Sequence, residues 1–284
     1  MTESKVSIPS ILQAKKEGRK LVMVTAYDYP FGLMADEAGV DMVLVGDSLG
    51  MVVLGLDGTV PVTLEMMIHH IRAVVRGCKK PLVVGDMPFM TYNTGIRDAI
   101  INAGRLMKEG GCDAIKLEGG VDFAPVVQAI VKAGIPVQGH IGLTPQTASA
   151  LGGFRMQGKD ATAARRIVED AKALEAAGSF SIVAEAVPAP LGRLVAEAVA
   201  VPVIGIGAGA EVDGQVLVTY DMVGLFDRFV PKFVKQYTQI RPTIIDAMKT
   251  FGDEVRSSVF PAPQHSFGMS AEALETLKAS LKKT

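Results

Sequence analysis

The chain contains no tryptophan, and its 284 residues include only two cysteines, Cys78 and Cys112. Two thiols without a close spacing supply neither a disulfide framework nor a zinc site, so they suit a reducing compartment such as the cytosol. The formal net charge is −1, which provides no basic face for nucleic acid and no polybasic surface for anionic lipid. We therefore expect neither nucleic acid nor a membrane as a partner.

Long apolar runs are also missing, although 49% of the residues are hydrophobic. No stretch of about eighteen apolar residues escapes a charge or a glycine-rich break, so we expect no membrane-spanning helix. The first twenty residues carry charges throughout and lack the apolar segment of a secretory signal. A chain of this length and composition can bury one large core, as α/β barrels do.

Short runs rich in β-branched residues alternate with longer amphipathic stretches. The runs lie at residues 21–28, 41–47, 81–88, 113–120, 135–145, 179–188 and 201–209, with a weaker eighth at 221–226. Such apolar strands, separated by helix-length crossovers, indicate a parallel sheet buried on both faces. Helices are expected to end in left-handed glycines before four of the strands, at Gly39, Gly110, Gly134 and Gly178. The pattern predicts one domain over residues 1–284, a (β/α)8 TIM barrel with extra C-terminal helices after Pro231.

Ionisable or hydroxyl side chains stand where nearly every predicted strand ends. In barrels of this kind, the chemistry lies at the C-terminal ends of the strands, where the connecting loops converge. We therefore expect these side chains to share one rim: Asp28, Asp47, Ser48, Asp86, Lys116, Glu118, His140 and Glu185.

Asp47 and Asp86 occupy equivalent positions on adjacent strands, each after an apolar run and a glycine. Two neighbouring carboxylates in a site of low dielectric repel each other unless a cation lies between them. Mg²⁺ is such a cation, commonly held by one or two carboxylates together with water and substrate. Glu118 could add a third oxygen, directly or through water. The alternative is that one aspartate caps the helix that follows it.

Lys116 and Glu118 are two residues apart on one strand, so their side chains point to the same side. They form either a surface ion pair or part of the barrel mouth, where a lysine suits a substrate carboxylate or a developing enolate. His140 either satisfies a backbone carbonyl or donates to a substrate oxygen.

Glu185 ends the sixth predicted strand. A partly buried glutamate has a raised pKa and is a competent general base near neutrality. The alternative is a structural ion pair with Arg193 or Lys172.

Seven motifs in order carry a resemblance to a known family: "TAYDYPFG", "VGDSLGMVVLG", "GDMPFMTY", "KLEGG", "GHIGLTPQ", "GGFRMQGK" and "IGIGAG" followed by "DGQVLV". The chain resembles the ketopantoate hydroxymethyltransferase (3-methyl-2-oxobutanoate hydroxymethyltransferase) family of the phosphoenolpyruvate/pyruvate barrel superfamily. The resemblance covers most of the chain. It departs from the family pattern at Ala186, Tyr220 and Gln264, where cysteine, histidine and glutamate are expected.

The resemblance implies a role for each site residue. Asp47, Asp86 and Glu118 would form the Mg²⁺ site. The 2-oxo acid would be bound by Asp47, Ser48, Asp86 and Lys116. From its place at the strand ends, His140 is a further candidate substrate-binding residue. Glu185 would be the catalytic proton acceptor.

The resemblance also implies transfer of a hydroxymethyl group from 5,10-methylenetetrahydrofolate to 3-methyl-2-oxobutanoate. The product would be 2-dehydropantoate (ketopantoate), in the first step of pantothenate and coenzyme A biosynthesis. The family is cytoplasmic and self-associates, commonly as a homodecamer. Two alternatives stay open, namely a Mg²⁺-dependent 2-oxo acid aldolase or C–C lyase on the same barrel, and a non-catalytic barrel that binds metal and oxo acid.

Overall fold

Eight parallel strands form a closed barrel in sequence order in the computed structural model, which describes residues 4–282. The strands are β1 (Leu21–Thr25), β2 (Met42–Val45), β3 (Leu82–Asp86), β4 (Ala114–Glu118), β5 (Val137–Gly142), β6 (Ser181–Glu185), β7 (Val203–Ile206) and β8 (Gly214–Leu217). The barrel closes where β8 pairs in parallel with β1. This confirms the predicted (β/α)8 architecture, and the first seven strands lie within the predicted ranges.

The prediction for the eighth strand is wrong. Residues 221–226 are not extended; β8 lies earlier, and the short helix α9 (Thr219–Met222) follows it. Only residues 207–213 connect β7 to β8, so the expected helical crossover is absent there. The buried and exposed positions of β8 alternate, so its sequence lacks the continuous apolar run that identifies the other strands. Gly214 is needed because a Cβ there would lie 2.5 Å from the Leu21 carbonyl oxygen.

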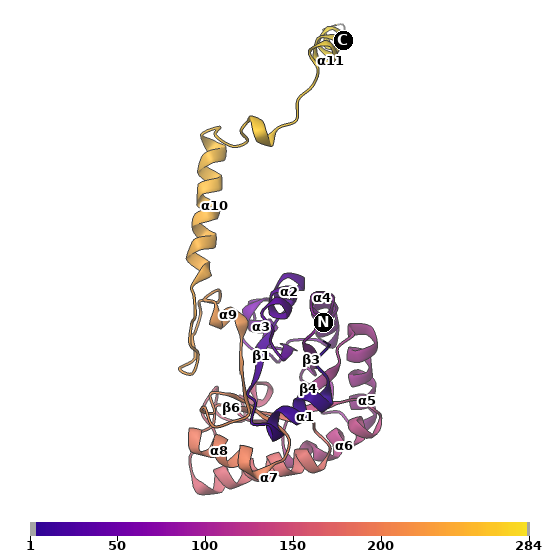
Figure 1. Ribbon diagram of the computed structural model, residues 1–284, viewed down its shortest axis with the longest axis vertical. Helices are drawn as coiled ribbons and strands as arrows, with labels where there is room; N and C mark the ends of the chain where they lie inside the picture. The colour runs from indigo at the N-terminus through magenta and orange to yellow at the C-terminus, as the bar shows by residue number, and fades with distance from the viewer. Residues whose placement is uncertain (1–3, 283–284) are drawn as a thin grey trace. The chain divides into compact units, whose positions relative to one another are not determined.

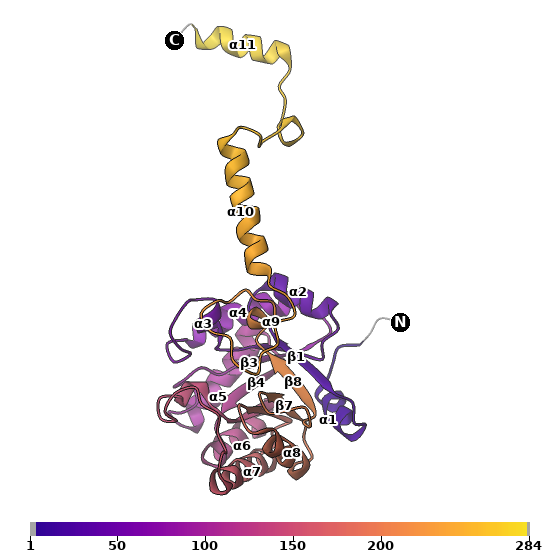
Figure 2. The same cartoon turned by 90° about the vertical axis from the view of Figure 1, so that its left-hand side faces the viewer.

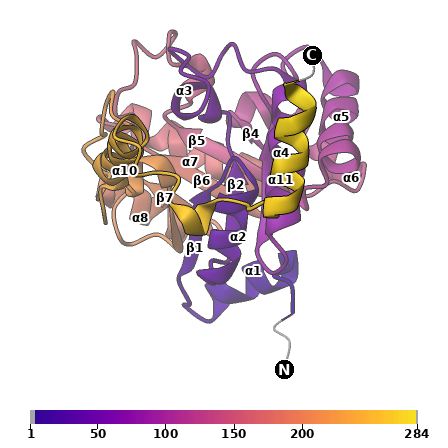
Figure 3. The same cartoon turned by 90° about the horizontal axis from the view of Figure 1, so that it is seen from above.

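Helices surround the barrel and close its N-terminal end. They are α1 (Ile8–Lys16), α2 (Tyr29–Glu37), α3 (Leu49–Val52), α4 (Leu64–Gly77), α5 (Ile96–Arg105), α6 (Ala124–Lys132), α7 (Ala161–Ala176) and α8 (Ala189–Ala198). Figure 1 shows α5, α6, α7 and α8 following one another around the outside, and in Figure 3 the strands lie inside α5, α6 and α8.

Most of the strands, β2, β3, β4 and β7 at every position, are buried on both faces, which accounts for their apolar runs. One buried cluster fills the barrel and includes Ile11 and Ala14 of α1, beneath strand residues such as Met42 and Val84. The other lies between the strands and the outer helices, with Val43 and Ile71 among its members. Figure 2 shows β7 and β8 beside α8, with α1 near β1. Packing on both faces leaves the strand ends as the natural place for polar chemistry.

Three of the four predicted glycine stops are confirmed: Gly39, Gly134 and Gly178 have φ of 70°, 89° and 100°. The prediction for Gly110 is wrong by one residue, since the left-handed residue is Gly111, with φ of 89°. A π-helical turn (Leu106–Gly110) extends α5, and its wider turn accommodates an extra residue before the chain leaves the helix. Gly110 serves packing instead, because a Cβ there would lie 2.9 Å from Ile71 Cγ2.

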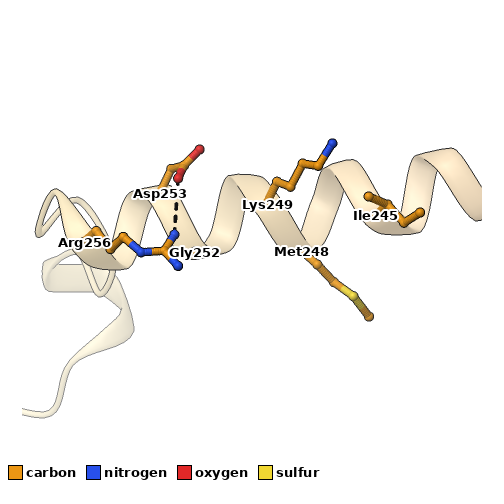
Figure 4. Close-up of a pocket in the computed structure, with 6 residues that line it drawn as sticks. All are labelled: Ile245, Met248, Lys249, Gly252, Asp253 and Arg256. Atoms are coloured by element: carbon orange, nitrogen blue, oxygen red, sulfur yellow. Dashed lines mark hydrogen bonds and ion pairs between the residues drawn. The ribbon is translucent and has the colours of Figure 1, made fainter.

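The C-terminal part is helical after Pro231, as predicted. The chain divides into one compact unit that ends at Tyr237 and a second that begins at Thr238. The second unit contains α10 (Ile240–Arg256) and α11 (Ala271–Leu281). The residues that line one pocket, labelled in Figure 4, all come from this one helix, α10. A single domain over residues 1–284 stays a prediction. Within residues 4–282, no helix is long and apolar enough to cross a membrane.

Candidate active site

One cavity of about 870 Å³ opens at the C-terminal ends of the strands. Seven of the eight side chains expected at this rim line it: Asp47, Ser48, Asp86, Lys116, Glu118, His140 and Glu185. The eighth, Asp28, instead caps α2, accepting a 2.8 Å hydrogen bond from the Phe31 backbone N–H.

Asp47 and Asp86 lie against each other at the ends of β2 and β3. The Asp47 backbone N–H donates to Asp86 Oδ2 over 3.2 Å, and both side chains are buried. Burial, together with the charges of Asp86 and Glu118, raises the pKa of Asp47 well above its usual value. Burial also raises the pKa of Asp86, although Lys116 opposes the rise. Neither residue is an N-cap: Ser48 holds that position before α3, and no helix follows Asp86 directly.

Lys116 is a buried cation among these carboxylates. Its Nζ lies 2.7 Å from Asp86 Oδ1 and 3.4 Å from His140 Nδ1. Burial disfavours the ammonium, but the attraction of Asp86, Glu118 and Asp47 outweighs it and raises the pKa of Lys116. Lys116 therefore stays charged, and the surface-pair interpretation is wrong, because the pair with Asp86 is enclosed in the barrel mouth.

His140 connects two carboxylates from neighbouring strands. Its Nδ1 lies 3.4 Å from Glu118 Oε1, and its Nε2 lies 3.2 Å from Glu185 Oε2. Burial and Lys116 disfavour the charged ring, but Glu118 and Glu185 outweigh them and raise the pKa of His140 to about 9. Both ring nitrogens face side-chain carboxylates, so His140 does not have the role in the alternative interpretation, in which it satisfies a backbone carbonyl.

Glu185 lies at the open edge of this cluster. Its side chain is 16% exposed, whereas those of Asp86 and Glu118 are 2% exposed. Arg193 does not reach it, since that guanidinium pairs with Glu197 at 2.8 Å and Glu211 at 3.5 Å. The next residue, Ala186, adopts the left-handed conformation with φ of 48°, which turns the chain directly after the carboxylate. Glu185 is thus the carboxylate of the cluster that a molecule in the cavity can reach most easily.

Gln146 joins the parts of the site, and the sequence did not single it out. Its Nε2 donates to Asp47 Oδ2 at 2.8 Å and to the Met87 carbonyl at 2.9 Å. Its backbone N–H donates to Glu118 Oε2 at 3.0 Å. Its Oε1 accepts a 2.7 Å bond from the Tyr92 hydroxyl. The sequence feature that could have identified Gln146 is its position in the loop after β5, the strand that carries His140.

A second tyrosine holds Ser48. The Tyr27 hydroxyl lies 2.9 Å from Ser48 Oγ, and the Tyr27 ring packs edge-on against Tyr220 with centroids 5.3 Å apart. Tyr220 also packs against Phe31, with centroids 5.0 Å apart. Tyr220, one of the departures from the family pattern, therefore supports the wall of the site from behind Tyr27.

A metal ion would have to be held by few protein ligands. Within the described chain, no group of three or more His, Cys, Asp or Glu side chains is arranged to hold one. Glu118 is already engaged, with one oxygen bound by Gln146 and the other beside His140. Asp47 and Asp86 are a pair of hard oxygen donors whose pKa values are raised, chiefly by burial and despite the nearby Lys116. Two carboxylates with water and substrate are the set that Mg²⁺ commonly takes, so the residues fit this ion.

The fold and the site together define an enzyme of the (β/α)8 class, with an acid–base cluster at the C-terminal rim of the barrel. A family model described as ketopantoate hydroxymethyltransferase matches residues 5–263. The chain belongs to the ketopantoate hydroxymethyltransferase family, a family of transferases.

Relatives in other organisms agree with this assignment. The chain is 58% identical over 268 residues to a 3-methyl-2-oxobutanoate hydroxymethyltransferase of Heliobacterium modesticaldum, covering 94% of this chain and 97% of the relative. It is 58% identical over 267 residues to that of Oleidesulfovibrio alaskensis, covering 94% and 92%. Among solved structures, phosphonopyruvate hydrolase in complex with oxalate and Mg²⁺ matches with a TM-score of 0.58 at 12% identity, covering 97% of this chain and 96% of that one. This last likeness shows the shared fold.

Proposed function

We propose that this enzyme transfers a hydroxymethyl group from 5,10-methylenetetrahydrofolate to 3-methyl-2-oxobutanoate and forms 2-dehydropantoate. The reaction would belong to pantothenate biosynthesis. The observation that carries the proposal is the line Lys116–His140–Glu185, which places a buried cation and an accessible carboxylate in one cavity. A carbon acid needs both, since its proton must be removed and the charge that develops must be stabilised.

Asp47 and Asp86 are the residues that would hold Mg²⁺, and Glu118 would complete its surroundings through water. This arrangement is supported by their contact, their burial and the engagement of both Glu118 oxygens by other groups. When bound, Mg²⁺ would withdraw electron density from the keto group of the oxo acid and make the C3 proton more acidic.

Lys116 would bind the oxo acid and balance the negative charge that develops on its oxygen. Its ammonium is held in place by Asp86 before substrate arrives, so little reorganisation is needed during reaction. Ser48, fixed by the Tyr27 hydroxyl, lies at the same end of the cavity and can hydrogen-bond a carboxylate. These contacts would orient the acid in the cavity.

Glu185 would take the C3 proton, and His140 would hold the Glu185 carboxylate in position. The C3 carbanion then forms its new bond to the methylene carbon of the folate. With one water consumed, the C3–H bond is replaced by a C3–CH₂OH group and tetrahydrofolate is released. Both bonds between the methylene carbon and the folate nitrogens break; one nitrogen takes its hydrogen from the consumed water, and the other takes the C3 proton, which Glu185 passes on directly or through solvent.

The experiment is a product assay with purified protein, Mg²⁺ and 3-methyl-2-oxobutanoate, with and without 5,10-methylenetetrahydrofolate. We expect 2-dehydropantoate only when the folate is present. Folate-independent cleavage of a 2-oxo acid would identify an aldolase or C–C lyase. Neither product nor exchange of the C3 proton would identify a binding protein.

We further propose that the enzyme is cytoplasmic and self-associates, with a homodecamer as the expected assembly. Support comes from the family resemblance and from an apolar stripe on α10. Ile244, Met248, Phe251 and Val255 lie on one face of this helix and are exposed. Such a stripe is typical of a surface that is covered in an assembly.

A further inference from the structure

The cavity has a part that the 2-oxo acid does not need. Its volume of about 870 Å³ is that of a site for a drug-sized molecule, whereas the acid has only five carbons. Beyond the acid–base cluster, the walls are apolar and aromatic, and their side chains include Met51, Leu56, Phe226, Phe229 and Phe233. Such walls suit a large, flat organic molecule.

Asp221 is a buried acidic residue of this second part, whereas the other acidic residue outside the cluster, Asp57, is exposed and lies 3.5 Å from Arg228. Asp221 lies in α9, directly after β8, and is 7% exposed although it lines the cavity. The helix is held in place because the Thr219 backbone N–H donates to Thr25 Oγ1 at 3.0 Å, and Tyr220 packs on Tyr27. The Asp221 carboxylate is therefore presented to the cavity by a fixed element.

This carboxylate has little to compensate its burial. Burial alone raises its pKa to about 6, without the opposing hydrogen bond or cation that Lys116 supplies to Asp86. Other aspartates that are shielded from solvent in the described chain have partners; Asp213, for example, accepts from Lys15 at 2.8 Å and from the Val203 backbone N–H. A buried carboxylate that faces a cavity without such partners is suited to accept hydrogen bonds from a ligand.

Cations stand at the outer edge of the same part. Arg228 lines the cavity, held by a 2.8 Å bond from its Nη2 to the Gly55 carbonyl, and Lys232 and Arg155 line it as well. All three residues are exposed. The lining thus combines a buried acceptor, aromatic rings and an exposed cationic rim.

We propose that Asp221 recognises the pteridine ring of the one-carbon donor by accepting hydrogen bonds from the N–H groups of its amino-pyrimidine edge. The inference rests on the proposed function, since it assumes a folate donor. The 2-amino group and the adjacent ring N–H present two donors side by side, which matches the two oxygens of a carboxylate. The phenylalanines would contact the ring faces, and the cationic rim would attract the glutamate carboxylates at the other end of the donor.

The test compares wild type with Asp221→Asn, which keeps the shape but replaces one acceptor oxygen by a donor. Tetrahydrofolate should bind about 10- to 100-fold more weakly, as expected for loss of charge-assisted hydrogen bonds. p-Aminobenzoylglutamate, which lacks the pteridine, should bind equally to both proteins. Exchange of the C3 proton of 3-methyl-2-oxobutanoate into deuterated water, which needs no folate, should be unchanged.

Two controls keep the result interpretable. Asp221→Ser also removes the carboxylate and should show the same selective loss of tetrahydrofolate binding. Agreement between the two variants assigns the loss to the carboxylate and not to a local effect of the asparagine. Asp122→Asn changes an exposed aspartate outside the cavity and should leave tetrahydrofolate binding unchanged.

Three outcomes would overturn the assignment of Asp221. If Asp221→Asn bound tetrahydrofolate as tightly as an active wild type does, the assignment of Asp221 would be wrong and the proposed function would still stand. Equal losses for tetrahydrofolate, p-aminobenzoylglutamate and proton exchange would make Asp221 structural. A wild-type protein that neither binds tetrahydrofolate nor uses the methylene donor would remove this assignment and the proposed function together.

Discussion

The backbone N–H of Asp47 donates to Asp86 Oδ2 at 3.2 Å, so two buried carboxyl groups from adjacent strands share one end of the cavity. The contact follows from the register of β2 and β3, in which Val45 is paired with Gly85. A parallel barrel thus turns two separate "GD" sequences into one pair of oxygen donors.

Asp47→Asn should raise the melting temperature of the metal-free protein but abolish the further rise that Mg²⁺ and the oxo acid cause. Burial, Asp86 and Glu118 disfavour the ionised form of Asp47, so removal of the charge should raise the melting temperature of the metal-free protein. The asparagine oxygen can still accept from Gln146. Mg²⁺ with the oxo acid should raise the melting temperature of wild type but not of the variant, and turnover should disappear.

Thermal denaturation in chelator, then with added Mg²⁺, measures both effects. Asp122→Asn is the matched control and should behave as wild type. Full activity of rigorously metal-free wild type would contradict the metal assignment, and a lower melting temperature of metal-free Asp47→Asn would contradict the charge argument.

Gln146→Ala should destabilise the protein more than the loss of a surface amide would. The change removes the amide that donates to the Asp47 carboxylate and accepts from the Tyr92 hydroxyl. These two buried groups each lose that hydrogen-bond partner. Each such group costs about 1–3 kcal/mol, so the free energy of unfolding should fall by about 2–4 kcal/mol. Urea denaturation measures it. Gln128→Ala, at an exposed position of α6, should change it by less than about 0.5 kcal/mol.

The parts of the fold that the sequence predicted share one physical signal. Strands such as β2 and β3 are buried on both faces, so they appear as continuous apolar runs, and the charged residue that ends each run is conspicuous. β8 alternates between buried and exposed positions, which hid it. The stop was predicted at Gly110 and lies at Gly111, because hydrophobic periodicity carries no sign of a π-turn.

The residues of the candidate site also fall into those that the sequence predicted and those that it did not. Asp47, Asp86, Lys116 and Glu118 were predicted because a charge within an apolar strand has few structural explanations. Gln146, Tyr92 and Asp221 lie in loops or short helices, where polar residues are common and their burial depends on contacts distant in sequence. Only the folded chain identifies them.

Asp221 should make stability depend on pH in a defined direction. Its pKa in the folded protein, about 6, exceeds the 3.8 of an unperturbed aspartate because of burial. Its neighbour Tyr27 stays neutral, since burial raises that pKa too. The folded state therefore holds the proton more tightly, and ionisation costs stability fully above about pH 6 and not below about pH 4. Asp221→Asn should be more stable than wild type at pH 8, and the difference should shrink toward pH 5. Urea midpoints at the two pH values measure it; a difference that grows as the pH falls would contradict the assignment.

Phe251 should matter for assembly and not for the barrel. It belongs to the exposed apolar stripe of α10, and its exposed fraction is 56%. We expect wild type to sediment as a species several times larger than 30.0 kDa. Phe251→Asp places a charge on the stripe and should give smaller species, whereas Thr250→Asp, on the neighbouring exposed position, should not. A wild type that is monomeric at micromolar concentration would contradict self-association.

Glu185→Gln should separate proton transfer from binding. Wild type should exchange the C3 proton of 3-methyl-2-oxobutanoate into deuterated water when Mg²⁺ is present, with or without folate, because proton removal precedes carbon–carbon bond formation. The variant keeps the shape of the side chain and can still face His140, but it lacks the basic oxygen. Loss of a general base typically costs about 10²–10⁴-fold in rate, so exchange should fall by that factor.

The oxo acid should still bind to Glu185→Gln, because Lys116 and Ser48 remain in place. Proton NMR follows the exchange, and calorimetry measures the binding. Glu197→Gln is the matched control: its carboxylate is exposed and pairs with Arg193, so exchange should match wild type. If Glu185→Gln exchanged at the wild-type rate, the base would be another group, with His140 the nearest candidate at 3.2 Å from Glu185 Oε2. If the variant lost oxo-acid binding as well, Glu185 would support the structure of the site instead of removing the proton.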